Sequence, residues 1–366
     1  MKTVVHVVGA RPNFMKIAPV MSALRACADA RQILVHTGQH YDERMAKVFF
    51  EELGLPRPDH DLGVGGGTHA EQTAGVMVAM ERVLAREAPD LVVVVGDVNS
   101  TLAASLVAAK AQVPVAHVEA GLRSFDLSMP EEINRMVTDR LSALLLTPSR
   151  DADGNLRREG APPERIRFVG NVMIDTLLTH RPRAPWPRVK ESLGLAERGY
   201  AVLTLHRPAN VDAPDRLARI LGRLAPVAAR FPIVFPVHPR TALRLVEAGG
   251  AVPGLRTVEP MGYLDFLALM DHAALVLTDS GGVQEETTVL GVPCFTLRDN
   301  TERPVTVSVG TNTLVGADAN SLPEAFRALD RGGGKRGGIP EGWDGRAGAR
   351  VAAAIGAFLG LAPNAP

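Results

Sequence analysis

Short runs of apolar residues alternate with helix-length segments along the whole chain. Most of these runs are dense in Val, Ile and Leu and lack strict polar alternation, which is typical of strands covered on both faces. Strands that alternate with helices predict parallel sheets joined by right-handed crossovers. The predicted strands are residues 3–8, 32–37, 91–95, 114–118, 143–146, 201–205, 233–237, 255–258, 275–278 and 293–297.

The series of strands restarts near residue 200, after a segment rich in proline and charge at residues 181–188. We therefore predict an α/β protein of two Rossmann-like, doubly wound domains, residues 1–170 and 171–346. A cleft between two such domains is a preferred place for a ligand. The alanine-rich segment 347–362 predicts a terminal helix that could pack back on the first domain.

Charge and cysteine content narrow the possible partners. The 366 residues include 40 basic and 40 acidic side chains, so no overall charge favours nucleic acid or an acidic membrane, and any anion site must be local. The first apolar run stops at Arg11 and reads as a strand rather than a signal peptide, and no run is long enough for a membrane span. Cys27 and Cys294 form no metal or redox motif, which fits the cytoplasm.

The stretch from residue 117 to residue 140 concentrates charge where a predicted strand ends. Glu119 follows the run 114–118, and Pro130 with Glu131 suits the first turn of a helix. Arg135 lies four residues after Glu131 on the same helical face, and Arg123 adds a second cation. We expect a ligand site at this carboxyl edge of the sheet. The simpler alternative is an ordinary ion pair at a helix start.

Two further turns in the first half follow strands. Gly9 permits a tight turn after the first strand, and Arg11 and Lys16 beyond it could reach an anion. The segment matches neither a dinucleotide-binding nor a Walker motif, and it could equally be a plain turn with solvated cations. Asp97 follows the run 91–95, where it could serve the site or simply cap the next helix.

The second half repeats this arrangement. His206 and Arg207 end the first strand of the second domain and are expected to face the cleft, although a lone histidine is often structural. His238 lies in a similar position, with weaker specificity.

A Ser-Gly-Gly turn follows the strand 275–278 and precedes a helix, which is the strongest physical signal in the chain. Free backbone N–H groups and the helix dipole at Ser280, Gly281 and Gly282 predict an anion site. Glu286, about one turn into the helix, could accept hydrogen bonds from ribose hydroxyls, and Arg303 supplies a further cation. The alternative is a glycine-rich helix start whose glutamates complement the dipole.

No dedicated metal site is expected. Asp151 and Asp153 resemble the Asp-x-Asp motif of some sugar transferases, but a helix start explains them. His36 and His40 have a spacing of four residues, but Gly38 favours a loop over a zinc-binding helix.

Taken in order, these segments resemble the non-hydrolysing UDP-N-acetylglucosamine 2-epimerase family. The resemblance spans nearly the whole chain and rests on Gly-Ala-Arg-Pro-x-x-Met-Lys, Thr-Gly-Gln-His, Gly-Asp, His-Val-Glu-Ala-Gly-Leu-Arg, Pro-Glu-Glu-Ile-Asn-Arg, His-Arg, Pro-Val-His, Thr-Asp-Ser-Gly-Gly-Val-Gln-Glu-Glu and Thr-Glu-Arg-Pro. It implies a glycosyltransferase-B-like pair of domains and a homodimer. It also implies reversible epimerisation of UDP-GlcNAc to UDP-ManNAc without NAD or another cofactor.

The resemblance also implies roles for individual residues. The expected reaction is anti elimination of UDP to 2-acetamidoglucal and re-addition, with catalytic groups Asp97, Glu119, Glu131 and His206. Diphosphate binding is expected at Arg11, Lys16, Ser280, Gly281 and Gly282, with Arg135 steadying the carboxylates. The remaining substrate contacts would be ribose at Glu286, uracil at Phe266, and further contacts at Arg303 and His238.

Some positions depart from the family pattern. Pro208, Ala209 and Asn210 stand where many members carry glutamate, and Met261 replaces a nucleotide-contacting glutamine. An activator site would use Gln39, His40 and Arg207, but Asp42 stands where a second glutamine is frequent. The open alternatives are a 2-epimerase of a 2,3-diacetamido uronic acid sugar nucleotide, a UDP-sugar glycosyltransferase, a hydrolysing epimerase and a sugar-nucleotide sensor.

Overall fold

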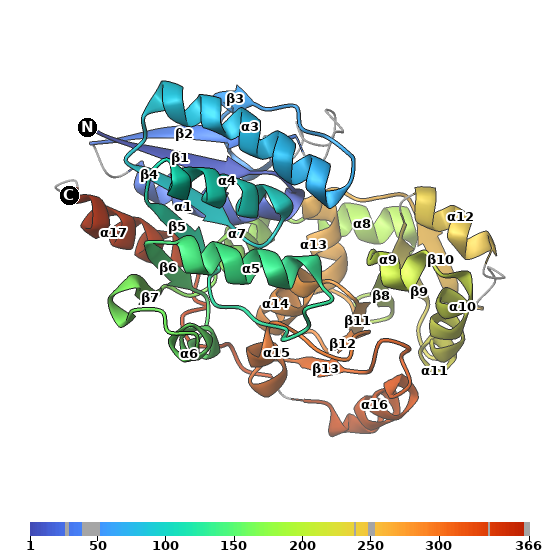
Figure 1. The fold of residues 1–366 in the computed structure, drawn as a ribbon. Coiled ribbons are helices and arrows are strands. Elements are labelled where there is room, and N and C mark those ends of the chain that lie inside the picture. The colour runs from blue at the N-terminus through green and yellow to red at the C-terminus, as the bar shows by residue number, and fades with distance from the viewer. Residues whose placement is uncertain (26–28, 39–51, 238, 248–252, 336, 362–366) are drawn as a thin grey trace. The chain divides into compact units, whose positions relative to one another are not determined.

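The computed structural model describes the chain except for residues 26–28, 39–51, 238, 248–252, 336 and 362–366. The chain divides into two compact units: Met1–Thr179 with Glu341–Pro366, and His180–Pro340. Each unit is a parallel β-sheet with helices on its faces (Figure 1), which confirms the predicted α/β class of two Rossmann-like domains. Among the described residues, no helix is both long and apolar enough to cross a membrane.

The sheet of the first unit has the strand order β3-β2-β1-β4-β5-β6-β7. Neighbouring strands pair in parallel throughout this order. The central strand β4 has the sequence Leu-Val-Val-Val-Val and is buried along its whole length, as expected for a strand covered on both faces. The strands are β1 (Lys2–Val8), β2 (Ala30–His36), β3 (His60–Asp61), β4 (Leu91–Val95), β5 (Val115–Val118), β6 (Leu144–Thr147) and β7 (Ile166–Phe168).

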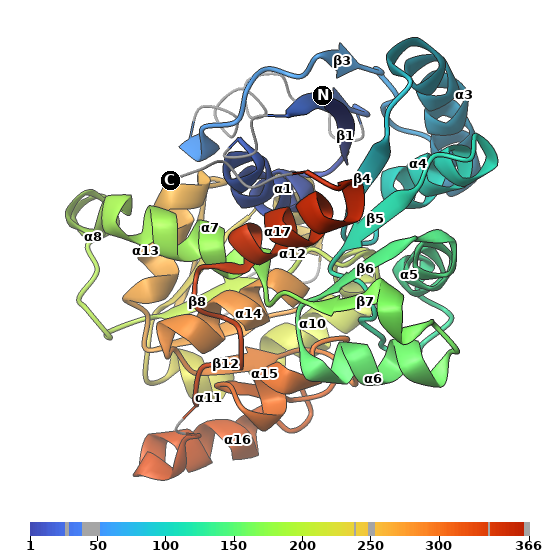
Figure 2. The same cartoon turned by 90° about the vertical axis from the view of Figure 1, so that its left-hand side faces the viewer.

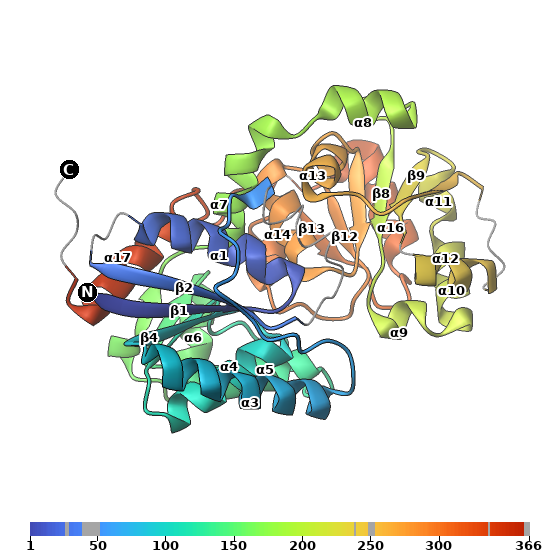
Figure 3. The ribbon, with the colours of Figure 1, turned by 90° about the horizontal axis from the view of Figure 1, so that it is seen from above.

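Helices cover both faces of this first sheet. Helices α3, α4 and α5 lie on one face, and α1 and α17 lie on the other (Figure 3). Apolar residues of β1, β2 and β4 pack with those of α3 and α4 into one core. The helices are α1 (Arg11–Leu24), α3 (His69–Glu87), α4 (Asn99–Lys110), α5 (Pro130–Leu141), α6 (Arg150–Arg158), α7 (Val172–His180) and α17 (Ala347–Leu359).

The terminal helix α17 packs against α1, as Figure 2 shows. Its first backbone N–H groups, those of Ala347 and Gly348, donate to the Asp175 carboxylate at 3.0 and 2.7 Å. Gly348 approaches α1 so closely that an added Cβ would lie 2.7 Å from the Pro19 carbonyl oxygen. The end of the chain is thus bound to helices that precede it by more than 150 positions.

The second unit has the strand order β10-β9-β8-β11-β12-β13, again parallel. Its strands are β8 (Ala201–Thr204), β9 (Ile233–Pro236), β10 (Leu255–Val258), β11 (Leu275–Thr278), β12 (Cys294–Thr296) and β13 (Asn312–Leu314). Its helices are α8 (Trp186–Leu193), α9 (Pro208–Val211), α10 (Pro214–Arg223), α11 (Ala225–Ala228), α12 (Pro239–Glu247), α13 (Tyr263–Asp271), α14 (Gly281–Leu290), α15 (Pro304–Ser308) and α16 (Leu322–Ala328).

Both sheets reverse their strand order at one position, between β1 and β4 in the first unit and between β8 and β11 in the second. Open parallel sheets bind ligands at the carboxyl ends of the strands next to such a switch point. The segments that follow β4, β5, β8 and β11 carry Asp97, Glu119, His206 and Ser280. The topology therefore places the predicted site residues at the two ligand-binding edges. The predicted cleft between the domains stays a prediction.

Candidate active site

Glu119 leaves β5 in an unusual backbone conformation. Its φ of 74° lies in the left-handed region, which residues other than glycine rarely adopt and which is concentrated at functional sites. The Glu119 N–H donates to the Leu146 carbonyl of β6 at 3.0 Å, which holds the turn. The Glu119 carboxylate pairs with the ammonium of Lys16 from α1, and both side chains are more than nine-tenths buried. A buried ion pair thus stands at the strand end that the sequence singled out.

Gly96 lies directly against this ion pair. With a φ of 67°, it turns the chain after β4, and an added Cβ would lie 2.9 Å from Lys16 Nζ and 3.5 Å from Glu119 Oε2. The buried Asn13 side chain supports the same region, because its amide donates to the Val95 carbonyl at 3.0 Å. Its oxygen accepts from the Gly9 and Ala10 N–H groups at 3.1 and 2.9 Å, so that turn is also fixed.

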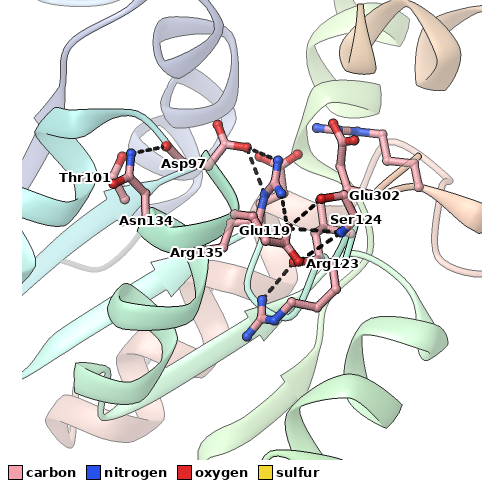
Figure 4. Close-up of polar contacts among 12 residues, drawn as sticks. Asp97, Thr101, Glu119, Arg123, Ser124, Asn134, Arg135 and Glu302 are labelled. Carbon is pink, nitrogen blue, oxygen red and sulfur yellow. Dashed lines mark hydrogen bonds and ion pairs between the residues drawn. The ribbon is translucent and has the colours of Figure 1, made fainter. Parts of the chain in front are cut away.

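The Asp97 carboxylate binds an arginine of α5. Arg135 donates to Asp97 Oδ2 from Nε at 2.9 Å and from Nη2 at 2.6 Å (Figure 4). Asn134 of the same helix donates to the Asp97 backbone carbonyl at 2.9 Å. The N-cap residue of α4 is Val98, whose side chain offers no cap.

The second carboxylate bound by Arg135 is Glu132, at 2.5 Å from Nη1. Glu132 is buried, and it also accepts from the Ser124 and Phe125 N–H groups at 2.9–3.1 Å. It therefore ties the loop after β5 to the start of α5. Glu131, the residue predicted from the sequence, lies half-buried in the first turn of α5.

A buried histidine connects the two strand ends. His117 of β5 contacts the Gly96 carbonyl through Nε2 at 2.9 Å and the Asp139 carboxylate through Nδ1 at 2.6 Å. Burial would raise the pKa of Asp139, but the charges and hydrogen bonds of His117 and Arg123 hold it below its usual value. Arg123 also binds Glu159 through two hydrogen bonds, so this predicted cation is part of the supporting structure.

In the second unit, His206 lies beside a buried carboxylate. Its Nδ1 is 2.7 Å from Asp279 Oδ1, and its side chain is 63% exposed. Arg207 is half-buried and donates from Nε to the Asp279 backbone carbonyl at 3.1 Å. The two residues predicted from the His-Arg pair thus meet the strand end that leads into α14.

The start of α14 is crowded by charged side chains. The prediction of a free N–H at Ser280 is wrong, because this group donates to Thr278 Oγ1 at 2.9 Å, and α14 begins at Gly281. An added Cβ on Gly281 would contact the Arg303 guanidinium and would lie 2.8 Å from Glu302 Oε1. Arg303 is buried and pairs with Glu302 and with Glu285, the latter at 2.7 Å. The predicted cation therefore lies directly over the predicted anion site.

Glu286 lies deeper in α14 and contacts a tyrosine. Tyr263 of α13 donates its hydroxyl to Glu286 Oε1 at 3.0 Å, and both side chains are buried. Burial raises the pKa of the Glu286 carboxyl to about 7. Phe266, one turn further along α13, is half-buried.

Three predicted positions, Gln39, His40 and His238, lie outside the described residues. Within the part of the chain that the structure describes, no group of His, Cys, Asp and Glu side chains could hold a metal ion. The expected absence of a resident metal stays a prediction.

Comparison with known proteins identifies the family. The model of the family described as UDP-N-acetylglucosamine 2-epimerase matches residues 22–356. The chain belongs to this family. The match confirms the family that the sequence resemblance predicted.

Two curated relatives agree with the family and differ in substrate. The chain is 45% identical over 333 residues to the UDP-N-acetylglucosamine 2-epimerase of Methanocaldococcus jannaschii, covering 88% of this chain and 91% of that one. It is 43% identical over 328 residues to the UDP-2,3-diacetamido-2,3-dideoxy-D-glucuronate 2-epimerase of Pseudomonas aeruginosa, with the same coverage. The protein is therefore a UDP-sugar 2-epimerase, an isomerase of the non-hydrolysing family.

A solved structure agrees in fold. The crystal structure of the M. jannaschii epimerase in complex with UDP-GlcNAc and UDP matches with a TM-score of 0.88 at 43% identity, covering 97% of this chain and 99% of that chain. The match confirms the glycosyltransferase-B-like fold of two α/β domains.

Two carboxylates of this epimerase that hold site residues in place, Glu132 and Asp279, were not predicted from the sequence. Glu132 follows Glu131 directly, and an arginine three or four residues later suits either, so spacing alone could not choose. Asp279 belongs to the predicted anion motif, but nothing in the sequence shows that it contacts His206, because that contact depends on β8 and β11 being neighbours.

Proposed function

We propose that this protein interconverts UDP-GlcNAc and UDP-ManNAc by inverting C2 of the sugar. The observation that carries the proposal is the pair of carboxylates at neighbouring strand ends of the first unit, each held by a cation. Glu119 is paired with Lys16 and Asp97 with Arg135. Support for the substrate comes from the M. jannaschii relative, which is named for UDP-GlcNAc and whose crystal contains UDP-GlcNAc and UDP.

The proposed route is elimination followed by re-addition. A base removes the proton from C2, its bonding electrons form the C1–C2 double bond, and the bond from C1 to the diphosphate oxygen breaks. UDP and 2-acetamidoglucal stay bound. The diphosphate oxygen then attacks C1 while an acid on the opposite face protonates C2. Each positioned acid or base contributes about 10²–10⁴-fold in rate.

The proposed roles follow the charges at the two strand edges. Carboxylates for the C2 chemistry are Asp97, Glu119 and Glu131, steadied by Arg135, while His206 exchanges a proton with the leaving diphosphate. Groups proposed to hold the diphosphate are Arg11, Lys16, Ser280, Gly281 and Gly282. The other proposed substrate contacts are Phe266, Glu286, Arg303 and His238.

The proposal includes no NAD and no resident metal. It takes the protein to be a homodimer, as the family resemblance implies, and to act in the cytoplasm, as its first apolar run and its cysteines suggest. An activator site at Gln39, His40 and Arg207 is proposed with lower priority than the catalytic site, because Asp42 departs from the family pattern.

A second substrate is favoured by one specific observation. The chain is nearly as similar to the P. aeruginosa relative, which is named for a 2,3-diacetamido glucuronate substrate, as it is to the UDP-GlcNAc enzyme of M. jannaschii. Both reactions use the same inversion at C2 next to an acetamido group. The second substrate would therefore require a different sugar pocket but the same reaction at C2.

Exchange of the C2 proton with solvent tests the proposal. The purified protein is incubated in D₂O with UDP-GlcNAc or with UDP-2,3-diacetamido-2,3-dideoxyglucuronate, and the sugar is followed by proton NMR. We expect deuterium at C2 and the manno epimer from UDP-GlcNAc. A Glu119→Gln control should exchange at least about 100-fold more slowly, because the amide is no base.

The outcomes distinguish the two proposed substrates and test the reaction itself. Exchange with the diacetamido compound alone would replace UDP-GlcNAc by the second substrate. Intact protein that exchanges neither substrate, or that releases free sugar or requires an acceptor, would contradict the proposed reaction.

A further inference from the structure

A buried carboxylate holds the His206 ring, and the roles proposed above leave it unassigned. Asp279 follows β11 and is fully buried, whereas the His206 side chain is 63% exposed. Oδ1 of Asp279 lies 2.7 Å from Nδ1 of His206. The contact follows from the sheet register, because Thr278 pairs with Thr204 and the residues after both strands leave side by side.

The same carboxylate also organises the turn that carries the histidine. Asp279 accepts from the His206 N–H at 3.2 Å and from the Arg207 N–H at 3.0 Å. The buried Asn210 side chain donates to Oδ2 at 3.0 Å. Burial would raise the pKa of Asp279, but His206 and the other donors hold it below its usual value, so the group stays a carboxylate.

This geometry determines which ring nitrogen carries the proton. A carboxylate only accepts hydrogen bonds, so Nδ1 of His206 must be the donor. In the neutral ring, the lone pair is then on Nε2, on the far side of the ring from Asp279. The exposed part of the ring therefore presents an atom that can accept a proton and return it.

We propose that Asp279 is a positioning residue that fixes His206 in the Nδ1–H form, so that Nε2 exchanges the proton with the diphosphate oxygen of UDP. The role rests on the proposed function. During elimination, the protonated Nε2 gives its proton to the departing oxygen as the C1–O bond breaks, and the ring becomes neutral. During re-addition, the proton returns to Nε2 as that oxygen attacks C1.

The form of the ring can be measured directly in the wild-type protein. Two-bond ¹⁵N–¹H NMR correlations distinguish Nδ1–H from Nε2–H imidazole, and a His206→Asn sample identifies the His206 signals by difference. We expect the Nδ1–H form wherever the ring is neutral. A wild-type ring in the Nε2–H form would overturn the proposal, whatever the protein's activity.

The Asp279→Asn variant tests the consequence for the reaction. Its amide can donate to Nδ1, which favours the Nε2–H form and leaves no acceptor on the exposed side. We expect the form to switch and kcat for C2 exchange to fall by on the order of 10²–10⁴-fold, with little change in KM. Asn210→Ala is the matched control: it removes another hydrogen bond to Asp279, and should lower stability while keeping the Nδ1–H form and kcat within a few-fold.

A double-mutant comparison separates positioning from a merely structural role. In a His206→Asn background, Asp279→Asn should slow exchange by no more than a few-fold, because a residue that acts through His206 has nothing left to act on. An equal loss of activity with and without His206 would overturn the proposal. If the wild-type protein shows the Nδ1–H form but no C2 exchange, the proposed function fails and the positioning geometry stands.

Discussion

At the scale of single residues, two unusual backbone conformations shape the edge of the first sheet at which we propose the catalytic groups. Gly96 and Glu119 both have positive φ values, 67° and 74°, where their strands end. At Gly96 the absence of a side chain lets Lys16 approach, and Lys16 in turn pairs with Glu119. The glycine is therefore required by the ion pair as well as by the turn.

Gly96→Ala is expected to displace Lys16 and reduce activity. A Cβ at this position would lie 2.9 Å from Lys16 Nζ, so the ammonium must move away from Glu119. A displacement of about 1 Å near the reacting groups can cost on the order of 10²-fold in rate, and we expect a loss of this size in C2 exchange. Gly160→Ala is the control, because Gly160 has a φ of 80° and nothing within 4 Å of an added Cβ.

The control isolates the steric effect. Both variants place alanine in the left-handed region, at a cost of about 1–2 kcal/mol in the free energy of unfolding. Only Gly96→Ala also displaces a cation. Equal activity of the two variants, measured per folded molecule, would show that the contact between Gly96 and Lys16 does not matter for the reaction.

Much of the candidate site could be predicted residue by residue, because polar groups directly after apolar strands meet at one edge of a parallel sheet. That rule located Asp97, Glu119 and His206. It could not show that Arg135 binds Glu132, because α-helical spacing permits either glutamate. The positive φ of Glu119 could not be predicted either, since nothing about a glutamate indicates a left-handed backbone conformation.

At the scale of elements, the central strands could be predicted and the short edge strands could not. Strands β4 and β11 consist almost entirely of Val and Leu, and their burial on both faces leaves a clear apolar signal in the sequence. The edge strands β3, β7 and β13 have only two or three residues each and include charged or polar side chains. Pairing with a neighbouring strand defines them, and that information is not local.

The packing of α17 on α1 gives a prediction at this scale. Gly348→Ala would bring a Cβ to 2.7 Å from the Pro19 carbonyl oxygen and 3.0 Å from Pro19 Cβ, whereas Gly356→Ala on the same helix meets only one atom, at 4.0 Å. Alanine favours a helix by up to about 1 kcal/mol over glycine in both variants. Overpacking costs about 1–3 kcal/mol and applies to Gly348 alone.

Denaturant unfolding of the two variants measures this difference. We expect Gly356→Ala to unfold at a higher denaturant concentration than the wild type, and Gly348→Ala at a lower one than Gly356→Ala. The gap between the two should correspond to about 1–3 kcal/mol, since the helix propensity largely cancels. Equal stability of the two would mean that α17 does not pack tightly against α1 at Gly348.

At the scale of the whole molecule, one topology is used twice for different chemistry. The orders β3-β2-β1-β4-β5-β6 and β10-β9-β8-β11-β12-β13 are the same arrangement of strands. In the first unit the switch point carries paired carboxylates, and in the second it carries His206 and the start of α14. We therefore expect UDP to be held mainly by the second unit, through Ser280, Gly281 and Gly282, and the first unit to act on the sugar.

Hydrogen exchange with UDP and with UDP-GlcNAc tests this division of roles. UDP at 100 times its Kd should slow exchange at Gly281, Gly282 and Val283 by up to about 100-fold, because opening of α14 then requires release of the ligand. The segment around Asp97 should respond only to the whole UDP-sugar.

Gly281→Ala should abolish the UDP effect, since its Cβ collides with Arg303. Gly291→Ala, at the far end of α14 with nothing within 4 Å of an added Cβ, should preserve it. Protection by UDP around Asp97 without protection of α14 would reverse the assignment, because the diphosphate would then bind the unit whose cations are already paired with carboxylates.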